Sequence, residues 1–422
     1  MKYIKCGNER SFEQEKETEK IVEDIINRIR IEKDAALWEL SKKFDEIKRE
    51  SFHITQKEIK EAYNLVDSKI INAIEKAHEN IKNFALLQKE SQKSISETEI
   101  SKGVYLSHNI VPIDSCMCYV PAGRYPLFST ALMLITPAKV AGVKRIAATS
   151  PVIKGTDKVN PIVLVAMDIA GADEITAIGG AQAIAAYAYG TESIKEVNII
   201  TGPGNKFVTE AKRQCYGKVG IDFTAGPSEV LVIGDESCNP KVAAADLIAQ
   251  SEHDVLAKGI MISTSEKLLL EVAKEVEEQL KRLSTENIAR KSWEDNGTLI
   301  YCESLEEAAK ISDETAPEHL EIMVKNPNEV ERLVKNYGSL FIGQYSAEVF
   351  GDYSSGTNHT LPTMGGAKYT GGVWVGTYTK TLTRQRLSKE GFSERSEITK
   401  EMARAEGLFG HENAVIQREI NL

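Results

Sequence analysis

Apolar residues recur at helical spacing through the first ninety residues of the chain, with charged residues between them. Two stripes follow this spacing: Val22, Ile25, Ile26 and Ile29 in one, and Ile59, Ala62, Leu65, Ile70, Ile74, Ala77, Ile81 and Phe84 in the other. Such stripes are typical of helices that bury one face. The pattern predicts a helical scaffold or dimer surface over residues 10–90, without chemistry of its own.

From about Ser115 the pattern changes to short apolar runs that alternate with Ala-rich segments. Strands followed by turns are expected at 116–123, 145–151, 174–180 and 197–204, and helices at 126–143, 161–172, 181–190 and 205–217. This repetition predicts a parallel sheet covered by helices on both faces. A further strand is expected at 258–265, a charged surface helix at 265–283, a strand at 297–304 and a helix at 304–316.

The stretch from Ile221 to Asp254 combines a turn, a buried strand and a capped helix. Asn239 and Pro240 are a usual helix start, and the helix ends in the polar cluster Gln250, Glu252, His253 and Asp254. Gln250 and His253 are three residues apart, so they share a helix face and can point at one ligand or ion. The alternative is a capping or solvated histidine, which is the commoner role for a histidine at a helix end.

Three later segments also carry chemically useful residues. Pro317 ends a predicted helix, which leaves Glu318 and His319 at the mouth of the next strand. Asp352 and His359 fall in a Gly/Ser-rich stretch that reads as a loop. The C-terminal tail reads as an amphipathic helix broken near Gly407, with Glu406 and His411 at the break.

Composition narrows the class of protein. A chain of 422 residues is long enough for two or more domains. Its net charge of −10 argues against nucleic acid or an anionic membrane as the main partner. We find no signal peptide and no run long enough to cross a membrane. Six scattered cysteines without a framework indicate reduced structural thiols and a cytoplasmic protein.

Three of the predicted strand-to-helix turns are rich in Gly or Pro: Pro121–Gly123, Gly179–Gln182 and Gly202–Asn205. In parallel sheets, ligands bind at the carboxyl ends of the strands, where helix N-termini attract phosphates. None of the turns has the G-x-G-x-x-G spacing, so the standard Rossmann fingerprint is absent.

With these motifs the chain resembles the histidinol dehydrogenase family over nearly its whole length. The resemblance rests on IDFTAGPSEVLVIGDESCNPKVAAADLIAQSEHD, PEHLEI, GDYSSGTNHTLPT, TGPGNKFV, GGAQAIAAYAYGTE and EGLFGHENAV. It implies an α/β fold of two incomplete Rossmann-like domains, related to aldehyde dehydrogenases, with a helical N-terminal region and a small C-terminal tail domain. The expected division is 1–118, which contributes to the first α/β domain, 119–229 for the NAD-side domain, 230–380 for the remainder of the first, and 381–422 for a tail that reaches the partner subunit.

The resemblance also implies a zinc-containing, NAD-dependent homodimer that oxidises an amino alcohol to an amino acid in two hydride transfers. The matching zinc ligands are Gln250, His253, Asp352 and His411, the last supplied by the other subunit, and the matching catalytic pair is Glu318 and His319. The positions that contact NAD match Tyr119, Gln182 and Asn205. Those on the substrate side match Ser228, His319, His359 and Glu406.

General chemistry agrees with this assignment. A histidine suits removal of the hydroxyl proton, and a carboxylate beside it can activate water for the step from aldehyde to acid. No cysteine lies at a matching catalytic position, so we expect no covalent thiol chemistry.

The substrate leaves alternatives open. L-histidinol, taken to L-histidine in histidine biosynthesis, is the first expectation. Around Arg124 and Tyr125, and again in residues 361–386, the sequence resembles a paralogous branch that includes sulfopropanediol dehydrogenases. There Arg124, assisted by Lys368 or Arg384, would bind the sulfonate of 2,3-dihydroxypropane-1-sulfonate. A zinc hydrolase is the alternative of another class, but it has no use for a nucleotide-binding half.

Overall fold

The computed structural model describes residues 1–7, 13–123 and 125–422, and it divides into two compact units. The main unit comprises residues 1–89 and 113–378, and the second unit comprises residues 90–112 and 379–422. In the described part of the chain, no helix is long and apolar enough to span a membrane.

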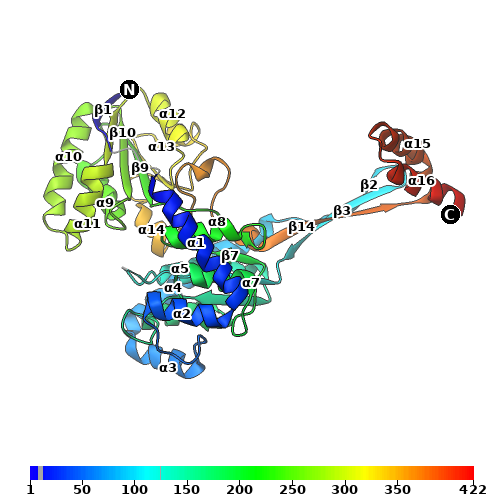
Figure 1. The fold of residues 1–422 in the computed structure, drawn as a ribbon. Coiled ribbons are helices and arrows are strands. Elements are labelled where there is room, and N and C mark those ends of the chain that lie inside the picture. The colour runs from blue at the N-terminus through cyan, green and yellow to red at the C-terminus, as the bar shows by residue number, and fades with distance from the viewer. Residues whose placement is uncertain (8–12, 124) are drawn as a thin grey trace. The chain divides into compact units, whose positions relative to one another are not determined.

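A five-stranded parallel sheet forms one half of the main unit (Figure 1), and its strand order is β6-β5-β4-β7-β8. The strands are β4 (Ser115–Tyr119), β5 (Arg145–Thr149), β6 (Glu174–Thr176), β7 (Ile199–Thr201) and β8 (Gly220–Ile221). The predicted parallel sheet is confirmed. Because the strand order reverses at β4, the turns after β4 and β7 open onto one crevice at the carboxyl edge.

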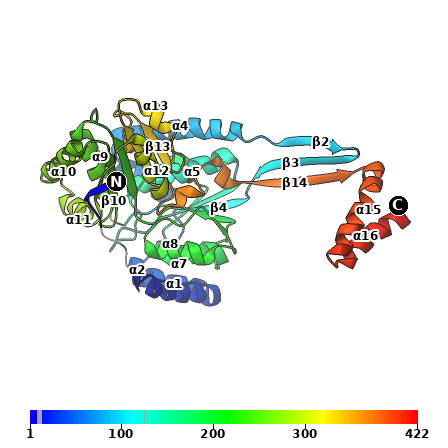
Figure 2. The ribbon, with the colours of Figure 1, turned by 90° about the horizontal axis from the view of Figure 1, so that it is seen from above.

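Helices cover both faces of this sheet. They are α5 (Ser129–Ala141) and α6 (Pro161–Ala170), which contact each other, and α7 (Gly180–Tyr189) and α8 (Lys206–Cys215), which contact each other. In Figure 2, α7 and α8 lie between the sheet and α1.

The N-terminal helices complete the same core. They are α1 (Glu13–Glu32), α2 (Asp34–Asp45), α3 (Gln56–Leu65) and α4 (Ser68–Ser91). The predicted stripe of Val22, Ile25, Ile26 and Ile29 is buried and belongs to one hydrophobic core with the five-stranded sheet.

The other half of the main unit is a six-stranded sheet of order β1-β11-β10-β9-β12-β13. Its strands are β1 (Lys2–Lys5), β9 (Glu229–Gly234), β10 (Lys258–Ser263), β11 (Thr298–Tyr301), β12 (His319–Met323) and β13 (Ser339–Ile342), and only β1 runs antiparallel to its neighbour. Val230 and Val232 of β9 face one core, whereas Leu231 and Ile233 face another. This alternation is the two-residue period of a strand buried on both sides.

Two sets of helices cover these faces. The first is α9 (Pro240–Ser251), α10 (Glu266–Leu280) and α11 (Glu286–Asn296), and the second is α12 (Leu305–Thr315) and α13 (Pro327–Glu331). A short helix, α14 (Glu348–Tyr353), follows β13, and two 3₁₀ turns lie at Gly366–Lys368 and Val375–Tyr378. The prediction of a loop around Asp352 is therefore wrong, because Asp352 lies on α14.

The second unit contains a three-stranded antiparallel sheet of order β14-β3-β2, followed by a helical pair. Its elements are β2 (Ile95–Ser101), β3 (Val104–Pro112), β14 (Thr379–Leu387), α15 (Lys389–Ala405) and α16 (Phe409–Asn421). The predicted helix break is confirmed, since Gly407 adopts a φ of +75° between α15 and α16.

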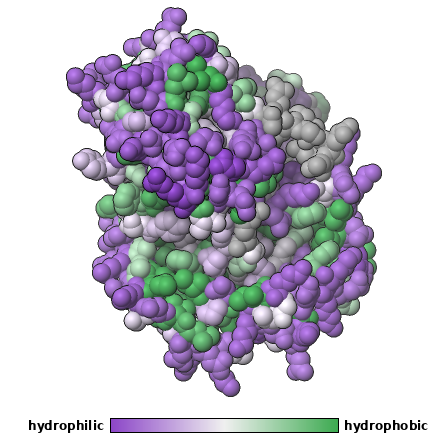
Figure 3. Space-filling view, turned by 90° about the vertical axis from the view of Figure 1, so that its left-hand side faces the viewer, coloured by the Kyte–Doolittle hydropathy of each residue, from purple (hydrophilic) through white to green (hydrophobic). Residues whose placement is uncertain are grey.

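The predicted domain division stays a prediction, although the structure shows how its segments associate. Helices of the 1–118 segment pack against the five-stranded sheet, and β1 joins the six-stranded one. The 381–422 segment shares its unit with the strands of residues 90–112. On the face shown in Figure 3, hydrophilic side chains predominate and apolar ones form smaller patches.

Candidate active site

The predicted catalytic residues of the main unit lie at the amino ends of β9 and β12, together with the polar end of α9. Glu229 is the first residue of β9 and His319 the first of β12, and the two strands are adjacent and parallel. Helix α9 starts at the Asn239 cap as predicted, the Asn239 side chain accepting from Lys241 N–H, and runs back to this edge. His253 lies in the turn just beyond the helix, where its N–H donates to the Gln250 carbonyl at 3.3 Å.

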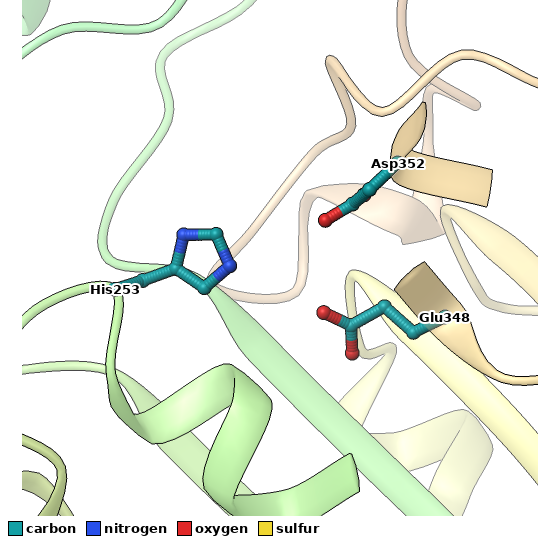
Figure 4. Close-up of side chains that lie close together, drawn as sticks. All are labelled: His253, Glu348 and Asp352. Carbon is teal, nitrogen blue, oxygen red and sulfur yellow. The ribbon is translucent and has the colours of Figure 1, made fainter. Parts of the chain in front are cut away.

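Three side chains converge on a candidate metal site, His253, Glu348 and Asp352 (Figure 4). One ligand atom from each lies within 4.8 Å of the other two. One imidazole nitrogen and two carboxylate oxygens are a donor set that zinc accepts. Glu348 was missed from the sequence, although it stands four residues before Asp352 and so shares its helix face.

Gln250 is fully buried behind this cluster, with its amide between two sets of partners. With its nitrogen toward Glu348, it donates to the two carboxylate oxygens at 2.7 and 3.1 Å, and its oxygen lies 2.8 Å from the Ser228 hydroxyl oxygen. The opposite orientation sets the amide oxygen against the Glu348 oxygens, which requires a proton or a cation between them. A role for Gln250 as an oxygen ligand therefore belongs to the cation-bound state.

Glu318 is buried beside the same turn. Its Oε2 accepts from the Ser228 hydroxyl at 2.6 Å and from the Glu229 N–H at 2.9 Å. Burial raises the pKa of Glu318 to about 8, against the lowering effect of these two hydrogen bonds. The carboxyl group is consequently poised to exchange a proton near neutral pH.

His319 is held in one tautomer. Its Nδ1 lies 3.1 Å from the Glu229 carbonyl oxygen, which only accepts, so Nδ1 carries the hydrogen. Nε2 is buried and has no hydrogen-bond partner in the described part of the chain, and it lies 3.9 Å from Asp352 Oδ1. Burial lowers the pKa of His319 to about 4. The ring is therefore neutral at pH 7, with a free lone pair directed into the site.

His359 links Asp352 to helix α5, which covers the five-stranded sheet. Its Nδ1 donates to the Asp352 carbonyl at 3.0 Å, and its Nε2 lies 3.3 Å from the Thr130 hydroxyl at the start of α5. Burial lowers the pKa of His359 as well. The start of α5, which follows the turn after β4, is thereby placed next to the edge of the six-stranded sheet that carries His319.

A second layer of carboxyl groups lies behind Glu348. Glu321 Oε1 accepts from the Glu348 N–H at 2.8 Å, and Asp246 lies beside Glu321. Burial raises the pKa of all three, that of Asp246 to about 6. The single-sequence pattern gave no signal for Glu321 or Asp246, since each sits singly in an apolar run.

The three residues matched to NAD contacts lie at the carboxyl edge of the five-stranded sheet or on its turns. The Tyr119 hydroxyl accepts from Gly180 N–H at 3.0 Å, and burial raises the pKa of Tyr119 to about 12. The Gln182 amide donates to Asp45 at 3.1 Å. Asn205 is exposed and caps α8 by accepting from Phe207 N–H and Val208 N–H.

Gly202 shapes the turn after β7. Its φ is +120°, and a Cβ there would lie 2.3 Å from the Tyr119 carbonyl oxygen, so no other residue fits. The buried ion pair of Lys212 and Asp222 holds this glycine at both ends, through Gly202 C=O and Gly202 N–H at 2.8 Å each.

Of the remaining predicted site residues, two belong to the second unit. Glu406 and His411 are exposed in the second unit, at the end of α15 and on α16. Arg124 lies outside the described residues. Of its two suggested helpers, Lys368 lines a surface hollow beside α12, and Arg384 is exposed on β14 in the second unit.

Known proteins resemble the chain over nearly all of its length. A sequence profile described as histidinol dehydrogenase matches residues 8–419. The histidinol dehydrogenase of Methanococcus maripaludis is 47% identical over 398 residues, covering 94% of this chain and 92% of that protein. A histidinol dehydrogenase homolog of Shouchella clausii is 42% identical over 411 residues, covering 97% and 96%. The crystal structure of histidinol dehydrogenase from Elizabethkingia anophelis matches with a TM-score of 0.91 at 36% identity, covering 99% and 95%.

Proposed function

The chain belongs to the histidinol dehydrogenase family, and we propose that it oxidises L-histidinol to L-histidine in two successive NAD-dependent steps at a zinc site. We further propose that it works as a cytoplasmic homodimer in which His411 and Glu406 of one subunit complete the site of the other. Six free cysteines, five of them buried, fit a reducing compartment.

The observation that carries the choice of substrate is the charge of the site. Glu318, Glu348 and Asp352 are buried together, and no Lys or Arg of the described residues forms an ion pair with any of them. Such a site offers a sulfonate no guanidinium or ammonium group of the described residues, whereas its carboxyl groups can accept hydrogen bonds from an ammonium group or an imidazole. Histidinol carries an ammonium group and an imidazole, so it suits this site better than dihydroxypropanesulfonate.

The residues divide the chemistry between them. His319 Nε2, neutral and unpartnered, accepts the proton of the alcohol in the first oxidation. Glu318, when ionised, takes a proton from the water that adds to the aldehyde, and the second oxidation then gives the acid. Ser228 holds the Glu318 carboxyl in place at 2.6 Å. The chain thus needs no thioester and no cysteine.

The donor sets fit both cofactors. His253 and Asp352, with Gln250 and Glu348 beside them, would hold zinc, which when bound stabilises negative charge on the substrate oxygen. Tyr119, Gln182 and Asn205 would hold NAD, which accepts a hydride in each oxidation. The two turns at Gly180 and Gly202 follow strands of the five-stranded sheet at its carboxyl edge, where nucleotides bind in such folds.

The stoichiometry tests the proposal. With zinc, NAD and limiting L-histidinol, we expect two NADH per histidinol consumed, and a higher kcat/KM for histidinol than for dihydroxypropanesulfonate. One NADH per substrate, with aldehyde left over, would refute the second step. NAD at about a hundred times its Kd should stabilise the fold by about 2.7 kcal/mol. Such stabilisation would exclude the zinc hydrolase, which has no use for NAD.

The pKa of Glu318 predicts a pH dependence of the second oxidation. Only the carboxylate can accept a proton, and a pKa raised to about 8 keeps most of the group protonated at pH 6. With the aldehyde as substrate, kcat/KM should therefore rise with pH and level off. The midpoint should lie at or below about pH 8, because a bound cation lowers the pKa of a neighbouring carboxyl. A profile unchanged in Glu318→Gln would contradict this role.

A further inference from the structure

Asp45, which carries no role so far, reaches the candidate nucleotide site from the N-terminal helices. It is the last residue of α2, and its Oδ2 accepts from Gly179 N–H at 3.3 Å and from the Gln182 amide at 3.1 Å. Burial raises the pKa of Asp45, and these two bonds oppose that effect. The carboxylate is thus built into the same turn as one of the residues matched to an NAD contact.

This contact changes what the start of α7 can bind. A helix N-terminus ordinarily attracts phosphate through its free N–H groups. Here Gly179 N–H is taken by Asp45 and Gly180 N–H by the Tyr119 hydroxyl at 3.0 Å. A carboxylate at this position also repels a phosphate. The part of a dinucleotide that lies against α7 is therefore an uncharged part with hydroxyl groups to donate.

Asp45 retains an acceptor for such a hydroxyl. Within the described residues, its Oδ1 accepts no hydrogen bond and Asp45 forms no ion pair. Gly179 lets the backbone approach Asp45 closely, since a Cβ there would lie 3.0 Å from Asp45 Oδ1 and 2.7 Å from Pro151 Cβ. One free carboxylate oxygen is what a ribose hydroxyl requires.

The topology identifies which ribose this is. The nicotinamide must reach the substrate, which we place beside His319. Helix α5 lies on that side, because Thr130 Oγ1 is 3.3 Å from Nε2 of His359, which also contacts Asp352. The segment after β6 lies on the far side, because β6 is the edge strand and stands two strands from β4, about 10 Å at the usual strand spacing. The adenosine half then lies beside α7 and Asp45.

We propose that Asp45 is the residue that selects NAD over NADP, accepting a hydrogen bond from the 2′-hydroxyl of the adenosine ribose and excluding a 2′-phosphate. This inference rests on the proposed function. In dinucleotide-binding folds an acidic residue commonly accepts a hydrogen bond from the ribose 2′-hydroxyl. Here we assign that role to Asp45, which lies at the end of helix α2 and not on a strand-to-helix turn.

Removing the charge alone tests it. Asp45→Asn keeps an oxygen for Gly179 N–H and Gln182, so the turn should persist. We expect kcat/KM for NADP to rise about tenfold or more and that for NAD to fall by a similar factor, the range of one charged hydrogen bond. The kcat with NAD should change little. Glu46→Gln is the matched control, because Glu46 is the next residue, is exposed, and among the described residues forms an ion pair only with Lys154.

Binding measurements do not depend on turnover, and the comparison of two ligands on the wild-type protein does not depend on the folding of a variant. In calorimetry, the probe is NAD that lacks the 2′-hydroxyl of its adenosine ribose. Wild-type protein should bind this probe about tenfold more weakly than NAD, whereas Asp45→Asn should bind the two alike. Wild type that binds both equally, or a variant that weakens NAD and NADP to the same degree, would overturn the inference. Wild type that binds no dinucleotide would overturn the proposed function itself, and this inference with it.

Discussion

His319→Asn should lower the rate of histidinol oxidation by about 100- to 10,000-fold, the usual cost of losing a general base. The free Nε2 of His319 is the only nitrogen lone pair without a partner among the buried side chains of the described residues. Asparagine can still donate to the Glu229 carbonyl that the ring contacts at 3.1 Å, so the start of β12 should hold its position. The loss should therefore appear in kcat, with the affinity for NAD unchanged.

Glu318→Gln should separate the two steps. Glutamine can accept the hydrogen bonds from Ser228 and Glu229 but does not take a proton from water. Oxidation of the aldehyde should therefore slow more than oxidation of the alcohol, and aldehyde should accumulate. His53→Asn is the control for His319→Asn, because the His53 ring, like that of His319, contacts a backbone carbonyl oxygen, that of Ser193 at 2.9 Å. Identical step-specific defects in the His319 and Glu318 variants would remove the assignment of separate roles.

The buried elements of the main unit were predictable because their apolar periods are strong. The buried strand expected between Ile221 and Asp254 appears as β9, and the helix that follows it starts at Asn239 and Pro240 as expected. The helical stripe of α1 is likewise buried. In each case local propensity and burial agree, which is the condition under which a single sequence is informative.

The three-stranded sheet of the second unit was not predicted, because its strands have no strong apolar period. Six of the seven residues of β2 are exposed, and β14 is exposed over most of its length. A strand that buries neither face shows no alternation of apolar and polar residues, and its register is set by backbone pairing alone. The polar sequences of β2 and β14 therefore carried no strand signal.

The site was predicted in part, and its gaps have a physical cause. His253 and Asp352 come together, but the Gly/Ser-rich context of Asp352 concealed α14 and with it Glu348. Asp45 was missed because it ends a helix in a charged segment, where nothing local distinguishes it from a solvated residue. Only the packing of α2 against the turn of Gly179 gives it a role.

His253→Ala should abolish tight zinc binding and with it the oxidation of histidinol. His253 supplies the only nitrogen of the three-residue cluster. Without it, the proposed site keeps a single imidazole, that of the partner subunit's His411, and is a poorer donor set for zinc. Zinc content after dialysis, measured by atomic absorption, gives a readout independent of turnover. Since His253 lies in a turn beyond α9 and not in a core, the far-ultraviolet circular dichroism should match that of wild type. His53→Ala is the matched histidine control.

His411→Ala should show the same loss, and mixing the two inactive variants tests whether the site spans subunits. His411 is exposed on α16, a helix with no buried residue, so its replacement should not disturb the fold. If each site takes His253 from one subunit and His411 from the other, a mixed dimer holds one intact site and one doubly altered site. Random exchange of equal amounts makes half of the dimers mixed, and activity and zinc content should return to about a quarter of wild type. Subunit exchange without any recovery would place His411 in the site of its own chain.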